Sequence, residues 1–264
     1  MCDPMISLSP PVDSISLPRR NARRQTLIGT SLALAICIGW LALHVVSMFF
    51  VSVALSSLPL VIVLAALLCW LSVGMFIVAH DAMHGSLAPG RPQLNAAIGA
   101  ALLFIYAGFG WTKLRAAHFE HHRHAGSARD PDFDADNPRH FGRWYMTFLR
   151  RYFGWQAALY VIAVVNIYYW VVGVPAANIV LLYGLPAIAS SVQLFYFGTY
   201  RPHRHDDHGF ADRHNARSDG FGPLLSLASC FHFGYHHEHH LSPNVPWWAL
   251  PARRRATLRR GADQ

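Results

Sequence analysis

Residues 56–84 read SSLPLVIVLAALLCWLSVGMFIVAHDAMH, an apolar run that ends in two histidines, His80 and His84. Up to residue 79 the run contains no Asp, Glu, Lys or Arg. An α-helix needs about 20 apolar residues to cross the hydrocarbon core of a bilayer, and this run is long enough. Residues four apart share one face of a helix, so both imidazoles point the same way. The stretch predicts a membrane helix with histidines at one end.

Three further apolar runs accompany this one. The predicted spans are residues 26–50, 56–79, 156–174 and 177–199. Hydrophobic residues make up 53% of the 264 residues and charged residues only 14%, whereas soluble domains carry about 25% charged residues. We therefore expect an all-α integral membrane protein, a four-span helical bundle. With no internal repeat and no linker, residues 1–264 are expected to form a single domain, with an N-terminal tail (1–24), a membrane domain (25–250) and a basic C-terminal tail (251–264).

The positive charges lie outside these runs. The chain has a net charge of +8, yet none of its 22 Lys and Arg residues falls within 25–90 or 152–200. Basic residues that flank apolar runs are typical of the cytoplasmic side of a membrane and of contact with anionic lipid head groups. The connections 51–55 and 175–176 contain no Lys or Arg. We therefore expect both termini to be cytoplasmic.

Residues 94–110 are apolar but short, and they contain three glycines. If the N-terminus is cytoplasmic, two crossings return His84 to the cytoplasmic side. A further full crossing would then put His118 on the opposite side, and one site could not collect both histidines. We expect 94–110 to be re-entrant or interfacial, with a fifth full span as the alternative. The polar segments 111–150 and 201–264 would then form a cytoplasmic cap.

Three histidine clusters carry the chemistry. They read His80-Asp-Ala-Met-His84, His118-Phe-Glu-His121-His122 and His236-His-Glu-His239-His240. Spacings of three and four residues place two or three imidazoles of each cluster on one helix face. Eight neutral nitrogen ligands are too many for one metal ion but suit two. Because imidazole accommodates Zn, Cu, Fe or Ni, the spacing predicts a dinuclear site and leaves the metal open.

Other histidine-containing metal motifs do not fit. The only His-Glu pair, His237-Glu238, is followed by Leu241 at the position where the metalloprotease motif HExxH has histidine. Neither Glu120 nor Glu238 begins the Glu-x-x-His pair of soluble di-iron bundles. A haem would need single histidines within facing spans, and only His44 lies inside an apolar run. An all-histidine non-haem centre remains, which suits O2 activation and oxidation of a lipophilic substrate that arrives from the bilayer.

The spacing HxxxH, HxxHH, HxxHH resembles the membrane-bound fatty acid desaturase and hydroxylase superfamily. Longer strings resemble the bacterial β-carotene ketolases within it. These strings are LSVGMFIVAHDAMHGSLAPG (71–90), FGTYRPHRH (197–205) and CFHFGYHHEHHL (230–241). The resemblance covers roughly residues 25–250. It implies that this part is a catalytic membrane domain in a bacterial inner membrane, with its metal site on the cytoplasmic side.

The resemblance also implies a di-iron site held by histidines. The implied ligands are His80, His84, His118, His121, His122, His236, His239 and His240. Members of the family generally add one histidine from the segment before the last cluster. His203 and His205 are both candidates, and we favour His203 because it directly follows the last predicted span. His232, one helical turn before the last cluster, is a less favoured candidate; His124, His214 and His237 are expected to be surface groups or neighbours of the ligands.

The reaction that the resemblance implies is conversion of the C4 methylene of the β-ionone ring of β-carotene to a ketone. Two hydroxylations and a loss of water would give echinenone- and canthaxanthin-type products, with O2 as co-substrate and hydroxylated carotenoids, on the way to astaxanthin, as further substrates to test. The chain has no GxGxxG, flavin or Fe–S motif, so a separate electron donor is expected. An acidic donor such as ferredoxin would suit the basic cytoplasmic face.

Two alternatives stay open at this point. A carotenoid ring hydroxylase or a fatty acid desaturase of the same superfamily would share the histidines. A membrane metal-binding or transport protein is an alternative of another class. Transporters place polar ligands near the bilayer midplane, whereas these clusters lie beyond the ends of the predicted spans.

Carboxylates near the clusters are expected to accept hydrogen bonds from the ring N–H groups of ligating histidines. The candidates are Asp81, Glu120, Asp206, Asp207 and Glu238. The acidic run 130–136 is expected to be a solvated loop. The aromatic residues Tyr106, Phe109 and Trp111 and the group 195–197 are expected to line an apolar tunnel.

Overall fold

The computed structural model describes residues 19–207 and 209–262, and every regular element in that part of the chain is helical. The helices are α1 (Arg19–Phe49), η1 (Leu55–Ser57), α2 (Leu58–His84), α3 (Pro92–Ala107), α4 (Trp111–His124), α5 (Phe141–Tyr152), α6 (Trp155–Asn166), η2 (Ile167–Val172), α7 (Ala176–Ile179), η3 (Val180–Gly184), α8 (Leu185–Phe195), η4 (Tyr196–Tyr200), α9 (Arg201–His203), α10 (Pro223–Cys230), α11 (His236–Leu241), η5 (Trp247–Ala249) and α12 (Leu250–Ala262). The predicted tail 1–24 lies mostly outside the described residues, and its last part, from Arg19 on, already belongs to α1.

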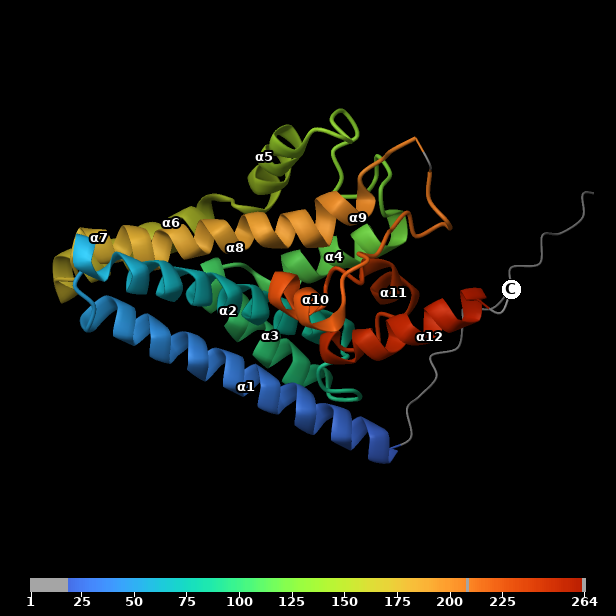
Figure 1. Ribbon diagram of the computed structural model, residues 1–264, viewed down its shortest axis with the longest axis horizontal. Coiled ribbons are helices and arrows are strands. Elements are labelled where there is room, and N and C mark those ends of the chain that lie inside the picture. The colour runs from blue at the N-terminus through green and yellow to red at the C-terminus, as the bar shows by residue number, and fades with distance from the viewer. Residues whose placement is uncertain (1–18, 208, 263–264) are drawn as a thin grey trace, which may run out of the picture.

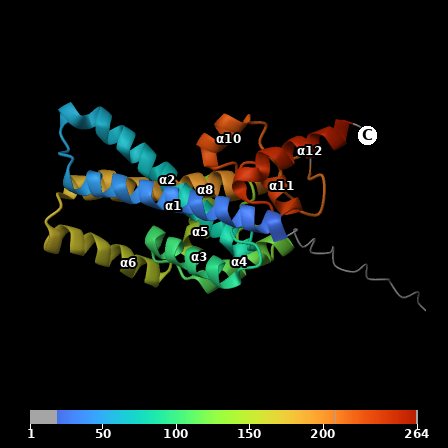
Figure 2. The ribbon, with the colours of Figure 1, turned by 90° about the horizontal axis from the view of Figure 1, so that it is seen from below.

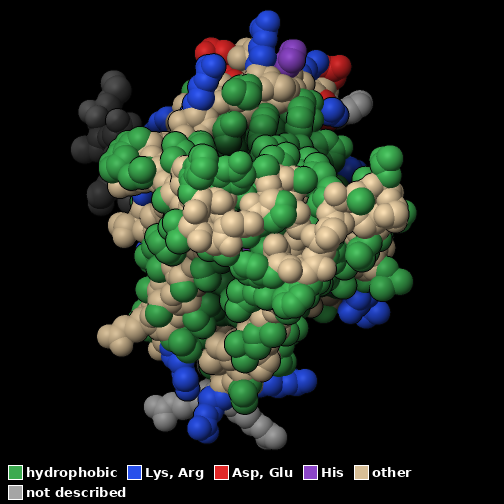
Figure 3. Space-filling view, turned by 90° about the vertical axis from the view of Figure 1, so that its left-hand side faces the viewer, with side chains coloured by type: hydrophobic (Ala, Val, Ile, Leu, Met, Phe, Trp, Pro, Cys, Tyr) green, Lys and Arg blue, Asp and Glu red, His purple; other side chains and the backbone are tan. Residues whose placement is uncertain are grey.

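Four helical stretches are long and apolar enough to cross a membrane, which confirms the predicted number of spans among the described residues. They are Asn21–Phe49, Leu55–His84, Trp155–Val172 and Ala176–His203. They run lengthwise along the bundle (Figure 1), and outward side chains such as Leu34, Ile62 and Ile188 are exposed. Viewed along the bundle from the α7 end, the surface is largely hydrophobic and Lys and Arg appear only towards its margins (Figure 3). A hydrocarbon environment accounts for this surface better than water does.

The segment 94–110, predicted to be re-entrant, forms most of α3 and the turn after it, and α3 and α4 together make a pair bent by 100°. The bend begins at Gly108, whose φ of +68° is accessible to glycine at little cost. The Trp111 ring packs directly on Gly99, closer than any Cβ there would allow. Helix α4 returns to the end of the bundle at which α3 began (Figure 1), so that His118 Nε2 lies 2.6 Å from His84 Nε2. The pair is therefore not one straight helix, and the re-entrant path stays a prediction.

The C-terminal segments cover the histidine-bearing end of the bundle. Helices α10 and α12 lie on one side and α3 and α4 on the other (Figure 2). Two consecutive residues with positive φ, Phe231 (47°) and His232 (62°), reverse the chain between α10 and α11. The Phe231 ring packs against Gly74 of α2, where a Cβ would come within 2.6 Å of it. This close approach seats α11 beside α2 and brings two histidine clusters together.

The segment expected as a basic C-terminal tail, 251–264, is helical up to residue 262. Helix α12 packs against α11, and Arg254 Nη1 donates to Glu238 Oε1 at 2.8 Å. Glu238 is fully buried. The ion pair therefore holds α12 against α11, because a buried carboxylate needs a partner of opposite charge.

Candidate metal centre

Eight histidines of the three clusters, with His203, meet in two adjacent groups. The five-histidine group consists of His80, His84, His118, His122 and His239. The four-histidine group consists of His121, His203, His236 and His240. Within each group the candidate ligand nitrogens all lie within 4.8 Å of one another. The groups adjoin, since the rings of His122 and His240 stack with centroids 4.2 Å apart.

Helices α4 and α11 each contribute to both groups. On α4 the residues four apart, His118 and His122, join the five-histidine group, while His121 joins the other. On α11 the arrangement is reversed, because the residues four apart belong to the four-histidine group and His239 crosses to the five-histidine group. The HxxHH spacing therefore does more than place imidazoles on one face: it gives each helix one nitrogen aimed at the second group.

The nitrogen atoms converge as metal ligands would. His239 Nε2 lies 3.0 Å from His122 Nε2, and His236 Nε2 lies 3.0 Å from the Nε2 atoms of both His203 and His240. His80 Nε2 and His121 Nε2 are buried, and neither has a hydrogen-bond partner among the described residues. An unsatisfied buried polar atom costs about 1–3 kcal/mol. A cation shared by each group would satisfy these lone pairs, so the residues fit a pair of metal ions.

The electrostatics favour the ligating form of the three α11 histidines that belong to the groups. Burial, followed by the neighbouring imidazoles, holds the pKa of His236, His239 and His240 well below the usual range of histidine. They are therefore neutral near pH 7, with a lone pair available on each ring, and metal binding requires that state.

The carboxylate that contacts a grouped histidine closely is Asp130, which lies against His121. The prediction of a solvated loop at 130–136 is therefore wrong at this position. Asp130 is buried, and His121 Nδ1 lies 3.0 Å from each of its carboxylate oxygens. The Gly126 amide donates to the same carboxylate at 2.8 Å. The turn at Gly126, with φ of +67°, reverses the chain directly after α4 and brings Asp130 back to it. A glycine just after the cluster is the sequence signal that could have indicated this.

The five carboxylates that were expected to accept hydrogen bonds from ligating histidines do not make the close contact that Asp130 makes. Asp81 does lie beside a group histidine, but at 3.7 Å from His80 Nδ1, and its other oxygen accepts the Trp247 amide. The other four pair with arginines: Glu120 with Arg123, Asp206 with Arg217, Asp207 with Arg139 and Glu238 with Arg254. Arginine fixes these carboxylates at the surface or, for Glu238, between α11 and α12.

The remaining candidate histidines lie outside both groups. His205 Nε2 lies 2.9 Å from the Gly126 carbonyl oxygen, and so it faces the loop after α4. His232 is buried against Trp247 and Tyr235. His237 lies 2.8 Å from the Asp212 carboxylate, and His124 lies 3.6 Å from Glu120. The structure thus brings His203, and not His205, to the other histidines.

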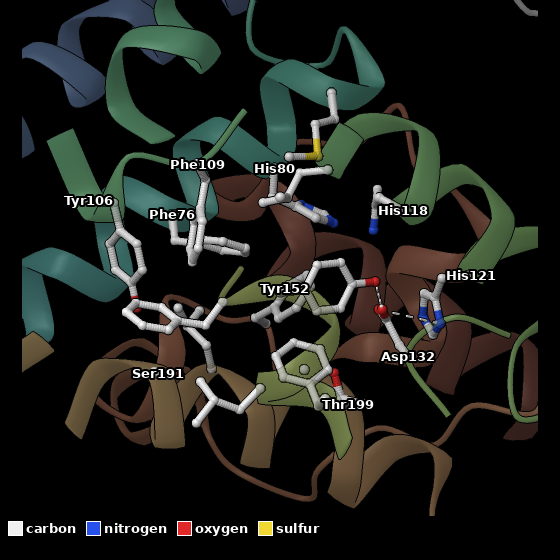
Figure 4. Close-up of a pocket in the computed structure, with 18 of the residues that line it drawn as sticks. Phe76, His80, Tyr106, Phe109, His118, His121, Asp132, Tyr152, Ser191 and Thr199 are labelled. Atoms are coloured by element: carbon white, nitrogen blue, oxygen red, sulfur yellow. Dashed lines mark hydrogen bonds and ion pairs between the residues drawn. The ribbon is translucent and has the colours of Figure 1, made fainter. Parts of the chain in front are cut away.

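An apolar pocket leads to the two groups (Figure 4). It has a volume of about 120 Å³ and is lined by His80, His118, His121 and His236 at one end. Most of its wall is apolar: Phe76, Met83, Phe109, Leu114, Phe148, Leu149, Phe153, Leu194 and Phe233. Tyr106 and Phe109 line the pocket as expected, whereas Phe195 is buried in a separate cluster with Trp144. The few polar groups in the wall include Asp132, whose pKa burial raises to about 6, and Tyr152.

Comparison with known proteins places the chain in a family. The fatty acid desaturase family model matches residues 55–264. A β-carotene ketolase from Paracoccus sp. (strain PC1) is 51% identical over 233 residues, which cover 87% of this chain and 93% of that protein. A second, from Paracoccus sp. (strain N81106 / MBIC 01143), is 50% identical over 241 residues, covering 90% and 96%. A zeaxanthin 4-ketolase from Chlamydomonas reinhardtii is 34% identical over 251 residues, covering 90% of this chain and 55% of that protein. The chain therefore belongs to the fatty acid desaturase family, and it is similar over most of its length to the β-carotene ketolases.

Proposed function

We propose that this protein is a membrane di-iron oxygenase that converts the C4 methylene of the β-ionone ring of β-carotene to a ketone. The observation that carries the proposal is the position of the two histidine groups at the end of an apolar pocket. Half of the sequence is shared with β-carotene ketolases over nearly their full length, which favours this reaction over ring hydroxylation or desaturation.

The nine histidines would hold two iron ions, one in each group. When bound, iron supplies the reduction of O2 that allows hydrogen to be removed from an unactivated C–H bond. The chain itself binds and orients the ring. The aromatic wall accommodates a hydrocarbon, the histidine-lined end receives C4, and the apolar lining excludes water from it. Asp130 fixes the ring orientation of His121 by accepting from Nδ1.

The overall change proceeds in two rounds at one carbon. In each round one oxygen atom of O2 enters a C–H bond at C4, and the other leaves as water with two electrons and two protons from outside. The first round gives the alcohol and the second gives a geminal diol. The diol loses water to become the ketone, so that echinenone forms from one ring and canthaxanthin from two.

The partners follow from the setting. The carotenoid would enter the pocket from the bilayer. The electrons would come from a separate acidic donor such as ferredoxin, which docks on exposed arginines of the cap such as Arg123, Arg255 and Arg259. We place residues 25–250 in the bacterial inner membrane as one catalytic domain, with both termini and the metal centre cytoplasmic.

Expression in a bacterium that accumulates β-carotene tests the proposal. Pigment chromatography is expected to show echinenone and canthaxanthin. Both products should be absent when the cells contain a His239→Ala variant at an equal level in the membrane. Accumulation of ring alcohols without ketone would identify a hydroxylase instead. Protein purified with its metal should contain close to two irons per chain, and zinc alone would contradict an oxygenase.

A further inference from the structure

One polar pair interrupts the apolar wall of the pocket near its metal-binding end. The Tyr152 hydroxyl donates to Asp132 Oδ1, and both side chains line the pocket (Figure 4). The other carboxylate oxygen, Asp132 Oδ2, lies 3.7 Å from His121 Nδ1. The pair therefore stands beside the four-histidine group, and it offers hydrogen-bond acceptors to whatever occupies the pocket there.

Both members of the pair are held in place by neighbouring groups. The Asp132 amide donates to Asp130 Oδ1 at 2.8 Å, and the Asp132 carbonyl accepts from Trp144 Nε1 at 2.7 Å. Arg151 donates to the two carbonyls that flank Asp132 in sequence, at 2.6 and 2.7 Å. The Tyr152 ring packs on Phe148, with centroids 4.8 Å apart. Hydrogen-bonding groups fixed in this way need no reorganisation when a ligand arrives.

The unoxidised ring makes no use of these acceptors, because β-carotene is a hydrocarbon. After the first round the ring carries one hydroxyl group at C4. A hydroxyl buried without a partner loses its hydrogen bonds to water without replacement, whereas a hydroxyl that donates to a carboxylate forms one of the stronger hydrogen bonds. The pair thus discriminates between the starting ring and the half-oxidised ring, in favour of the latter.

We propose that Asp132 and Tyr152 are positioning residues that retain the half-oxidised ring by hydrogen-bonding its new hydroxyl group. The inference rests on the proposed function and deepens it. An enzyme that makes a ketone oxidises the same carbon twice, so the alcohol has to stay until the second round. A hydroxyl held beside His121 keeps C4 at the histidine-lined end of the pocket, and Tyr152 and Asp132 themselves form or break no covalent bond.

The test is the product ratio of a Tyr152→Phe variant in β-carotene-producing cells. The change removes only the hydroxyl and keeps the ring contact with Phe148. Loss of one hydrogen bond should speed release of the alcohol about fivefold, and the ratio of 4-hydroxylated to 4-keto rings should rise by about that factor. Iron per chain should stay unchanged, because Tyr152 reaches the histidines only through Asp132. A ratio equal to that of the parent protein would overturn the proposal.

A second tyrosine provides the matched control. Tyr106 lines the same pocket but lies away from the pair (Figure 4), where its hydroxyl is 2.9 Å from Ser190 Oγ. Tyr106→Phe should leave the ratio of alcohol to ketone as it is in the parent protein. An equal rise in both tyrosine variants would mean that the pocket has merely loosened, which also contradicts the proposal.

Direct supply of the half-oxidised substrate keeps the inference testable if a variant accumulates poorly. Membranes that contain the parent protein, Tyr152→Phe or Asp132→Asn are given either β-carotene or its 4-hydroxylated form. In Tyr152→Phe, the KM for the alcohol should rise about five times as much as the KM for β-carotene. In Asp132→Asn, the KM for the alcohol should also rise more than the KM for β-carotene. Equal changes for both substrates would overturn the retention role. If the parent protein oxidises neither carotenoid, the proposed function fails instead.

Discussion

His121 Nδ1 lies 3.0 Å from both carboxylate oxygens of Asp130, while its Nε2 atom is buried with no partner among the described residues. A hydrogen bond on one nitrogen sets the tautomer and leaves the lone pair on the other. Nε2 of His121 is therefore presented to the four-histidine group. Its sequence neighbour His122 faces the five-histidine group. The contact between His121 and Asp130 therefore lies at the boundary between the two groups.

Asp130→Asn should weaken metal binding at the four-histidine group. The amide accepts through one oxygen only and lacks the negative charge, and partners of this kind are worth about 10–100-fold in metal affinity. Titration with an iron chelator should therefore remove about one iron per chain more readily than in the parent protein. Asp136→Asn, an exposed position in the same loop, is the control. Equal retention of iron in both variants would show that Asp130 has no such role.

The ninth ligand can be assigned by replacing each of two nearby histidines with alanine. His203 Nε2 lies 3.0 Å from His236 Nε2, whereas His205 bonds the Gly126 carbonyl. His203→Ala should lower iron content and abolish ketone formation, because it removes a ligand. His205→Ala should keep its iron and reduce activity only partly. Elemental analysis of the two purified variants decides the matter, and the opposite pattern would overturn the assignment of His203.

The topology can be read with reporter fusions at residues 53, 115 and 215. We expect the first to report the periplasmic side and the other two the cytoplasm, since His84 and His118 lie together at one end of the bundle. A periplasmic signal at 115 would mean that this bent pair crosses the membrane, which the common site of His84 and His118 does not allow.

Gly99→Ala should destabilise the helix pair. A Cβ at this position collides with the Trp111 ring, and overpacking of this kind costs about 1–3 kcal/mol. The thermal unfolding midpoint in detergent should fall, together with activity. Gly110→Ala is the matched control, because a Cβ there meets nothing within 4 Å. Equal midpoints for the two variants would argue against the role of the Gly99 contact.

Arg254→Met should weaken the packing of α12 on α11. It leaves the fully buried Glu238 carboxylate without its cation, and breaking a buried ion pair costs about 3–5 kcal/mol. The effect should lie at the lower end of that range, since the Arg254 side chain is 22% exposed. Arg255→Met, at an exposed position on the same helix, should change the unfolding midpoint little. A stable Arg254 variant with full iron content would show that α12 is dispensable for the centre.

The sequence by itself determined the features that depend only on the length of an apolar run or on the spacing of residues within one helix. Uncharged apolar runs of sufficient length specify the four spans, because the bilayer requires every backbone hydrogen bond to be made within the helix. The spacing of three and four residues in clusters such as 118–122 places their imidazoles on one face before any tertiary contact forms. The short glycine-containing run 94–110 is predicted to be re-entrant for a geometric reason, namely the need to bring His84 and His118 to one side.

Only the tertiary structure decided which histidine belongs to which of the two groups. His121 and His122 face different groups because the neighbours of α4 differ on its two flanks, and sequence spacing does not encode those neighbours. The inclusion of His203 in a group, the capture of His121 by Asp130, and the pairing of Tyr152 with Asp132 depend on segments that approach one another across the fold. Periodicity is a property of one helix, whereas each of these contacts depends on where two separate segments of the chain meet.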